Sequence, residues 1–325
     1  MKRIAVLFFG QPRQLEKGSE FIKPFFDFSE IGVQTDYFFH SWTLVDPKKE
    51  NRTYEVGHKD QHTLEELSLK QKIVELYNPV SIKIDDPISD VLFTEEAQRF
   101  VDLWNQIRYN VPLGEKTRYF EETKSAHEFL SNVARVKYKI GQLVSSERVI
   151  QSKVDYESKN GFEYDVVFRI RTDMAYKPSW LKDKLKYIEN GLSHSAHAPR
   201  DLNQVCVNYL KISNGVPLCG DQNIWGKSKS VDKLFTGCTN SFFNYVKRLL
   251  NKCSQGYYRE DPEFVRGRFL HIEIAIPVAA MDHDCSVFAT VSGPNGAGSH
   301  ALIRDTVEAT DNYQTIHEKH CDFFK

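Results

Sequence analysis

The sequence predicts an α/β fold with a mostly parallel central sheet flanked by helices. Two observations carry this prediction. Short apolar segments typical of buried strands alternate with longer segments whose apolar residues recur at helical spacing. Turn-forming residues such as Asp85-Asp86-Pro87 and Asn160-Gly161 separate these segments. Ligands of such sheets bind beyond the carboxyl ends of the strands, so the residues after each predicted strand are the first functional candidates.

The first half of the chain contains three predicted strands. In order, its elements are a strand over residues 2–9, a helix over 14–28, a strand over 35–42, a polar loop over 46–61, a helix over 63–77 and a strand over 81–84. Pro24 is expected to interrupt or end the first helix because proline lacks the backbone N–H.

The second half begins with the longest helical pattern. The elements are a helix over 123–154 that Asn160-Gly161 closes, strands over 165–171 and 205–210, helices over 228–250 and 261–275, and a strand over 286–291. Along the strand over 165–171, Val166, Phe168 and Ile170 share one face, and Val167, Arg169 and Arg171 share the other.

Composition excludes several classes of protein. The 325 residues include 43 Lys and Arg against 44 Asp and Glu, and this balance argues against a nucleic-acid partner. No apolar run approaches the roughly 20 residues of a membrane span, so no transmembrane segment is expected. The apolar run Ile4 to Phe9 is too short for a secretory signal. The six cysteines have irregular spacing and form no Cys-x-x-Cys pair, which favours a cytoplasmic location.

The first candidate site is the turn Gly10-Gln11-Pro12-Arg13, which follows a predicted buried strand. Glycine allows a ligand to approach the backbone closely, and the planar guanidinium of Arg13 suits a diphosphate or a nucleobase. The alternative is a plain turn between a strand and a helix, with Pro12 near the helix start.

The second candidate is Arg171-Thr172-Asp173, at the carboxyl end of another predicted strand. A carboxylate at Asp173 can bind Mg²⁺ or Mn²⁺, which prefer oxygen ligands and substrate phosphates. Arg171 could neutralise phosphate charge. The alternative is an Arg–Asp pair that only closes a loop.

The third candidate is the segment Gly220-Asp221-Gln222-Asn223. Its carboxylate and amides suit sugar hydroxyls, and Asp221 could act as a general base. A simple turn is the equal alternative, because Gly, Asp and Asn are common turn residues.

Two further residues carry weaker signals. Lys137 falls inside the apolar stripe of the long helix, so it either pairs with a polar partner or reaches a phosphate. Glu263 follows Asp261-Pro262, which is a typical helix N-terminus, and could also face an acceptor hydroxyl.

The order and spacing of four segments resemble a known family. They are the segment from Ile4 to Arg13, Thr35-Asp36-Tyr37-Phe38-Phe39-His40-Ser41-Trp42, the segment from Tyr164 to Asp173, and Gly220-Asp221-Gln222-Asn223-Ile224-Trp225-Gly226. Together they resemble nucleotide-sugar glycosyltransferases of the GT-A fold, in particular a group from bacterial surface-polysaccharide clusters and large algal viruses. In that group Arg-x-Asp stands where other GT-A enzymes carry Asp-x-Asp.

The resemblance implies a function and an organisation. It implies a Rossmann-type sheet and a hexosyl- or pentosyltransferase that uses a nucleotide-sugar donor and a glycan acceptor in the cytoplasm of a bacterium or a virus-infected host cell. Residues 1–290 would form one catalytic domain, with a nucleotide-binding part over about 1–175 and an acceptor-side part over about 176–290. Residues 291–325 would form a C-terminal flap or tail.

The resemblance also implies roles for particular residues. Gly10, Gln11, Arg13, His40, Trp42, Lys137, Arg171 and Gln222 would bind the donor, Asp173 would bind a divalent cation, Mn²⁺ or Mg²⁺, and Asp221 and Glu263 would be the catalytic candidates. The chain departs from the group at Phe9, where the group has Ser. It also carries one acid, Asp173, where the metal motif of other GT-A enzymes has two.

Two alternatives stay open at this point. One is a nucleotidyltransferase on a similar sheet, although the first loop has only one Gly where such enzymes usually carry a glycine-rich loop. The other is a catalytically silent carbohydrate-binding or interaction protein that kept the fold. Nucleotide binding, measured as a rise in melting temperature, separates the silent protein from the enzymes.

Overall fold

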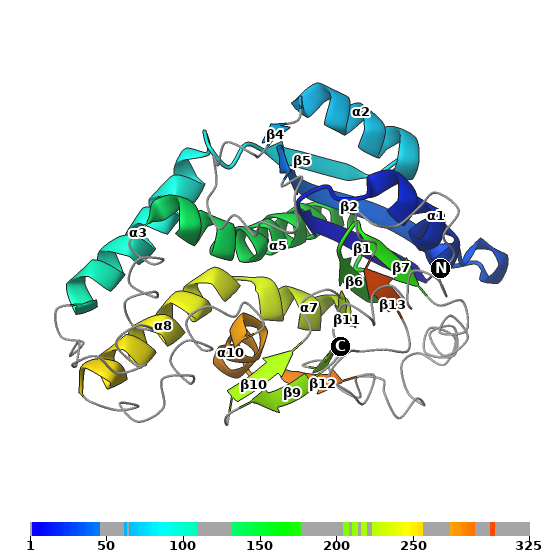
Figure 1. Ribbon diagram of the computed structural model, residues 1–325. Helices are drawn as coiled ribbons and strands as arrows, with labels where there is room; N and C mark the ends of the chain where they lie inside the picture. Colours follow the sequence, from blue (N-terminus) through cyan, green and yellow to red (C-terminus); the bar gives the residue numbers. More distant parts are fainter. Residues whose placement is uncertain are drawn as a thin grey trace.

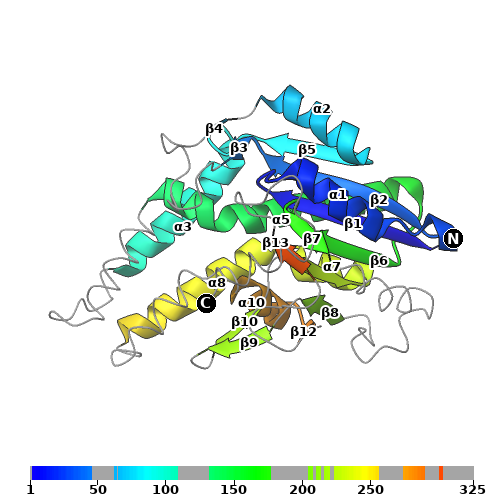
Figure 2. The same ribbon diagram turned by 45° about the vertical axis from the view of Figure 1, so that its right-hand side comes forward.

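The computed structural model describes residues 2–45, 62–63, 65–108, 132–176, 204–207, 210–213, 216–219, 223–255, 274–289 and 300–302. Within these ranges the centre is a seven-stranded sheet with the strand order β12-β8-β11-β6-β1-β2-β5. Helices lie on both faces of this sheet (Figures 1 and 2). The predicted α/β fold with a mostly parallel central sheet is therefore confirmed.

The parallel half of the sheet contains four strands. These are β1 (Arg3–Gly10), β2 (Gln34–Trp42), β5 (Ser81–Asp85) and β6 (Val166–Ile170). They lie in the order β5-β2-β1-β6, which is 3-2-1-4 when these four are counted along the chain. The direction of strand addition thus reverses between β1 and β6. Ligands of open α/β sheets bind at such a reversal, beyond the carboxyl ends of the strands.

The other half of the sheet comes from later parts of the chain. Strand β11 (Asn223–Gly226) runs antiparallel to β6 and to β8 (Gln204–Val207), and β12 (Ser286–Ala289) runs parallel to β8. The edge of the sheet beyond β6 is therefore built from residues that follow the parallel half in sequence.

Three short antiparallel pairs accompany the sheet. They are β3 (Leu44–Val45) with β4 (His62–Thr63), β9 (Leu210–Ser213) with β10 (Val216–Cys219), and β7 (Met174–Tyr176) with β13 (His300–Leu302). Strand β13 belongs to the predicted C-terminal flap, and it lies beside the strand that begins directly after Asp173. The division into nucleotide-binding and acceptor-side parts stays a prediction.

The helices form two layers. In chain order they are α1 (Leu15–Phe26), a 3₁₀ turn (Ser29–Ile31), α2 (Glu66–Tyr77), α3 (Val91–Arg108), α5 (Val133–Asn160), α7 (Ser228–Phe235), α8 (Cys238–Ser254) and α10 (Ala275–Asp282). Helices α1 and α2 pack on one face of the parallel strands, and α5 packs on the other face (Figures 1 and 2).

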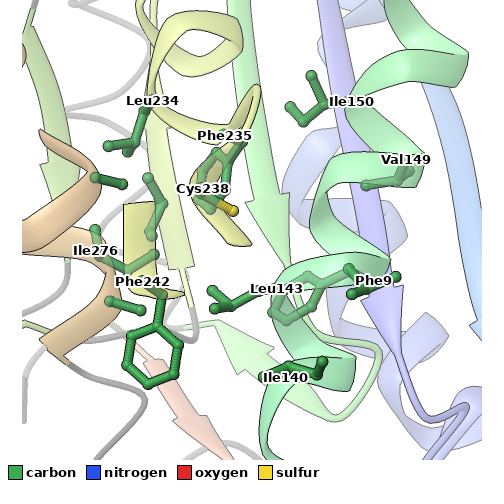
Figure 3. Packing of buried hydrophobic residues seen from close by; sticks show 14 of the residues in the cluster. Phe9, Ile140, Leu143, Val149, Ile150, Leu234, Phe235, Cys238, Phe242 and Ile276 are labelled. Atoms are coloured by element: carbon green, nitrogen blue, oxygen red, sulfur yellow. The ribbon is translucent and has the colours of Figure 1, made fainter. Parts of the chain in front are cut away.

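The alternation of side chains along β6 explains these layers. Val166, Phe168 and Ile170 enter the core under α1 and α2, whereas Val167 enters the core under α5. This is the assignment of faces that the sequence predicts. On the α5 face, Ile140 and Leu143 of α5 face the side chains of α8 and α10 (Figure 3).

Several predicted boundaries differ from the structure. Helix α5 begins at Val133 rather than near residue 123, because Asn132 is extended and its side chain accepts from the N–H groups of Ala134 and Arg135. Its predicted end is correct, since Gly161 terminates it with φ 67°. Helix α1 continues two residues beyond Pro24, which stands in its last turn.

Other differences concern the number of elements. The helix predicted over 228–250 is two helices, because Gly237 adopts φ 76° between α7 and α8. The strand predicted over 205–210 ends at Val207 in the described residues. Helix α3 was not predicted, although buried Phe93, Ala97, Phe100 and Trp104 carry the helical spacing. The predicted loop over 46–61 and most of the predicted helix over 261–275 lie outside the described residues.

Candidate functional site

The turn after β1 is fixed through the backbone of Gly10. Gly10 adopts φ 88°, a left-handed conformation that glycine tolerates without strain. Its N–H donates to the hydroxyl of Ser145 at 2.7 Å, and its carbonyl accepts from the hydroxyl of Ser41 at 3.2 Å. Both polar groups of the Gly10 backbone are thus held by side chains, from α5 and from β2.

The two polar side chains of this turn bind each other. Arg13 donates from Nε to Oε1 of Gln11 at 2.9 Å and from Nη2 to the same oxygen at 2.5 Å. Both residues are partly exposed. A guanidinium has five N–H donors, so these two bonds orient Arg13 and leave donors for a ligand.

The segment after β6 contains a two-pronged ion pair. Arg171 donates from Nε to Oδ1 of Asp173 at 2.8 Å and from Nη2 to Oδ2 at 2.7 Å. The Asp173 carboxylate is 1% exposed, whereas the Arg171 side chain is 21% exposed. Because two parallel N–H···O bonds join the guanidinium to the carboxylate, the contact has a defined geometry and also neutralises both charges.

The two segments are joined where the strand order reverses. The Thr172 hydroxyl donates to the carbonyl of Arg13 at 2.8 Å. Gly18 of α1 lies so near the Thr172 carbonyl that a Cβ there would be 1.9 Å from its oxygen. The structure therefore brings the turn with Gly10 and Arg13 next to the segment with Arg171 and Asp173.

His40 and Trp42 lie behind this turn and are buried. The His40 ring contacts the Ser145 hydroxyl through Nδ1 at 2.7 Å and the Asp85 carboxylate through Nε2 at 2.9 Å. Trp42 donates from Nε1 to the Gly141 carbonyl at 3.2 Å. Neither ring is on the exposed side of the turn, and both connect β2 to α5.

Lys137 is also engaged within the protein. Its ammonium donates to the Pro87 carbonyl at 2.6 Å and to the Thr94 hydroxyl at 2.5 Å, and it lies 5.2 Å from the centre of the Phe93 ring. Of its two sequence-based interpretations, the pairing with polar partners describes its position. Lys137 ties α5 to the start of α3.

Of the third candidate segment, Gly220-Asp221-Gln222-Asn223, the structure describes only Asn223. Asp221, Gln222 and Glu263 lie outside the described residues, so their predicted roles stay predictions. Asn223 is the first residue of β11 and is 1% exposed, and its amide oxygen is buried without a hydrogen-bond partner in the described structure. A buried acceptor of this kind raises the free energy of the folded state unless something binds it.

Two residues near the turn, Ser145 and Arg148, were not predicted from the sequence. Ser145, Arg148 and Asp85 form a chain of contacts behind Gly10. Asp85 was expected only as one of the residues that follow a predicted strand, where a ligand could bind. The available signal for Ser145 was a polar residue inside the apolar stripe of a long helix, the same signal that marked Lys137.

Charges around Asp85 hold it ionised. Burial alone would raise the pKa of Asp85, but the hydrogen bond from His40 and the positive charges of Arg148 and Lys83 lower this pKa to about 2. Burial lowers the pKa of His40 below its usual value, although Asp85 opposes this shift. Near neutral pH the pair is therefore an ionised carboxylate and a neutral imidazole.

The binding of a divalent cation at Asp173 stays a prediction. Both oxygens of the Asp173 carboxylate accept from Arg171, and the carboxylate is 1% exposed. Within the described residues, no group of three or more His, Cys, Asp or Glu side chains could hold a metal ion. Magnesium is often held by one or two carboxylates with substrate phosphates and water, so one acid suits a cation that arrives with a phosphorylated ligand.

Comparison with known proteins assigns no family. No family model matches this chain, and no curated protein matches it. Among solved structures it is similar to mouse xyloside xylosyltransferase 1 in its apo form, with 10% sequence identity and a TM-score of 0.38; the match covers 89% of this chain and 85% of that one. A likeness at this level carries no argument about activity. Across the part of the chain that the structure describes, no helix has both the length and the apolar composition that a membrane crossing requires.

Proposed function

We propose that the protein is a glycosyltransferase that moves a sugar from a nucleotide-diphosphate sugar to a glycan or another hydroxyl acceptor. The observation that carries the proposal is the meeting of two segments at the reversal of strand order. One is a glycine turn with an oriented arginine, and the other is the Arg171–Asp173 pair. This is the position in an open α/β sheet where nucleotides bind.

The chemistry of the two segments suits a leaving diphosphate. Negative charge develops on the diphosphate as the bond to the sugar breaks, and fixed cationic donors aimed at that charge stabilise the transition state. The partly exposed Arg171 and Arg13 are held in place by Asp173 and Gln11, so little reorganisation is needed when the ligand binds. A divalent cation bound at Asp173 would add Lewis-acid stabilisation of the same leaving group.

The acceptor side depends on residues that remain candidates. If the reaction inverts the sugar configuration, one carboxylate must take the proton of the acceptor hydroxyl, and Asp221 and Glu263 are the candidates for this role. Asp221 and Gln222 directly precede Asn223, whose buried amide oxygen is without a partner in the described residues. A sugar hydroxyl that donates to this oxygen would remove its desolvation cost.

The first test is direct binding of sugar nucleotides. Isothermal titration and thermal shift are measured with UDP-, GDP-, CMP- and dTDP-sugars, with Mn²⁺, with Mg²⁺ and with a chelator. We expect one nucleotide to bind, and we expect Asp173→Asn to weaken this binding about tenfold or more, because the variant loses the negative charge that orients Arg171 and attracts a cation. Asp155→Ala, which changes an exposed acid of α5, serves as the control.

The outcomes separate the parts of the proposal. If no sugar nucleotide binds the folded protein, the transferase proposal is wrong and the silent carbohydrate-binding alternative gains support. If binding is equally tight with the chelator, the cation is not required while the transferase proposal stands. If Asp173→Asn binds like Asp155→Ala, the diphosphate does not lie at the Arg171–Asp173 pair.

A further inference from the structure

A continuous chain of hydrogen bonds runs behind the glycine turn. The Gly10 N–H donates to Ser145 Oγ at 2.7 Å, Ser145 Oγ lies 2.7 Å from His40 Nδ1, and His40 Nε2 lies 2.9 Å from Asp85 Oδ2. Ser145 and His40 are almost fully buried, at 0% and 1% exposure. The Arg148 guanidinium closes the chain by bridging Asp85 to Asp90 at the start of α3.

The direction of each proton follows from the chemistry of the groups. Asp85 is ionised and only accepts, so the proton of His40 is on Nε2. A neutral imidazole with this tautomer has an acceptor at Nδ1, and the Ser145 hydroxyl then donates to it. The Ser145 oxygen in turn accepts from Gly10. The Ser145 hydroxyl also lies 3.3 Å from the His40 carbonyl oxygen, which is a longer contact than its 2.7 Å to Nδ1.

We propose that His40 is a positioning residue that acts through Ser145 to fix the Gly10 turn in the conformation that receives the diphosphate of the donor. This inference rests on the proposed function, because it assumes that the turn contacts the ligand. Neither His40 nor Ser145 touches the ligand. Their contribution is to hold the Gly10 N–H toward α5 and thereby fix the neighbouring peptide groups of the turn, which reduces the ordering cost of binding.

Arg148 gives the chain its anchor. Besides its two carboxylate partners, its guanidinium lies 5.3 Å from the centre of the Trp42 ring. Trp42 stacks on Phe93 with ring centres 4.8 Å apart. The far end of the chain is therefore tied to β5, α3 and α5 at once, so Asp85 is a fixed acceptor for the imidazole.

The arrangement predicts a dependence on pH. The charged groups that face His40 are Asp85 and Lys83 of β5 and Arg148 of α5, with Asp90 beyond Arg148. Protonation of His40 turns Nδ1 from an acceptor into a donor, and the Ser145 hydroxyl then donates to the His40 carbonyl at 3.3 Å instead. The Nδ1–H and the Gly10 N–H then both donate to Ser145 Oγ, and sharing this oxygen weakens the bond that holds Gly10. Burial keeps the pKa of His40 below the usual value of a histidine. We therefore expect ligand affinity to fall as the pH drops through this lowered pKa.

The test combines a local probe with ligand affinity. Amide hydrogen exchange at Gly10, read by NMR, and the dissociation constant of the sugar nucleotide are measured for the wild type, Ser145→Ala and the control Ser152→Ala. Ser152 lies on the same helix, and its hydroxyl donates only to the Arg148 carbonyl among the described contacts. We expect Ser145→Ala to lose Gly10 protection and to bind about 5- to 10-fold more weakly, and we expect Ser152→Ala to match the wild type.

His40→Asn supplies a second, independent variant if Ser145→Ala does not fold. Asparagine does not titrate, so the fall in affinity at low pH should vanish in this variant. Both phosphates of a nucleotide-diphosphate sugar are diesters, and the ligand itself adds no titration in that range. A merely structural role of His40 would lower stability without removing the pH dependence of binding.

The outcomes distinguish this inference from the proposed function. A wild type that binds no sugar nucleotide overturns both. A wild type that binds while Ser145→Ala loses Gly10 protection but keeps its affinity overturns only the positioning role. If ligand affinity still falls at low pH in His40→Asn, the positioning role is overturned as well. The positioning role is supported if Ser145→Ala loses the Gly10 protection and binds the sugar nucleotide more weakly, while Ser152→Ala does neither.

Discussion

Replacing Gly18 by alanine is expected to lower the free energy of unfolding by about 3 kcal/mol or more. A Cβ at this position would be 1.9 Å from the Thr172 carbonyl oxygen and 3.1 Å from the carbon. The obstacle is backbone between β6 and β7, so it cannot rotate away as a flexible side chain would. Helix α1 must move outward instead, and its buried residues Ile22, Phe25 and Phe26 lose packing.

The measurement is chemical and thermal unfolding of Gly18→Ala against Gly32→Ala. Gly32 has φ 70° and open space where a Cβ would be, so alanine there adds only backbone strain of about 1–2 kcal/mol. We expect Gly18→Ala to melt at least about 6 °C below the wild type. This decrease in melting temperature is expected although alanine has a better helix propensity than glycine. If Gly18→Ala is no less stable than Gly32→Ala, α1 is not held against Thr172 as described.

Replacing Lys153 by methionine is expected to cost about 3–5 kcal/mol near neutral pH. The Lys153 side chain is 0% exposed, and its ammonium bonds Glu157 and Asp232 at 2.8 Å each and also contacts the Ser228 hydroxyl. Methionine fills a similar volume without the charge. Two largely buried carboxylates then remain without their cation, and this is the main source of the expected loss.

The loss should depend on pH in a defined direction. In the wild type, burial raises the pKa of Asp232 to about 6, with further contributions from Glu157 and Glu163 that Lys153 opposes. A carboxyl whose folded-state pKa is raised costs stability as the pH rises through that pKa, and costs nothing below its unfolded value of about 3.9. Lys153→Met should therefore be most unstable at pH 7 and above and should approach the wild type near pH 4.

Unfolding by urea at several pH values checks this expectation. Lys159→Met, an exposed change on the same helix, provides the control and should stay within about 1 kcal/mol of the wild type at every pH. If the free energy of unfolding of Lys153→Met stays the same amount below that of the wild type from pH 4 to pH 7, the electrostatic explanation is contradicted. Lost packing would then explain the difference.

The sequence predicted most of the parallel half of the fold. Strands β1, β2, β5 and β6 were located to within one or two residues, because their apolar runs end at turn residues. Helix boundaries were less accurate. The apolar stripe of α5 does not reveal its start, which depends on the Asn132 side chain capping two backbone N–H groups. Helix α3 was missed although its buried aromatic residues follow the helical period.

The candidate site was predicted in part. The segment with Gly10 and Arg13 does meet the segment with Arg171 and Asp173. They meet because parallel strands bring their carboxyl ends to one edge of the sheet. His40 and Trp42 were expected at the same place, and they lie one layer behind it. Alternation along β2 places their side chains on the face toward α5, which the residue types alone do not reveal.

The sequence by itself determined the α/β class and the positions of the glycine turn and the Arg–Asp pair at strand ends, because these features depend on short-range patterns. Only the tertiary structure decided which buried polar groups bind each other. His40 lies 105 residues from Ser145 and 45 from Asp85 along the chain. Such partners are set by the register of the sheet and the rotation of α5 upon it. Because an unpaired buried polar group raises the free energy of the folded state, and because packing decides which groups are close enough to pair, the contacts behind Gly10 are a property of the assembled layers.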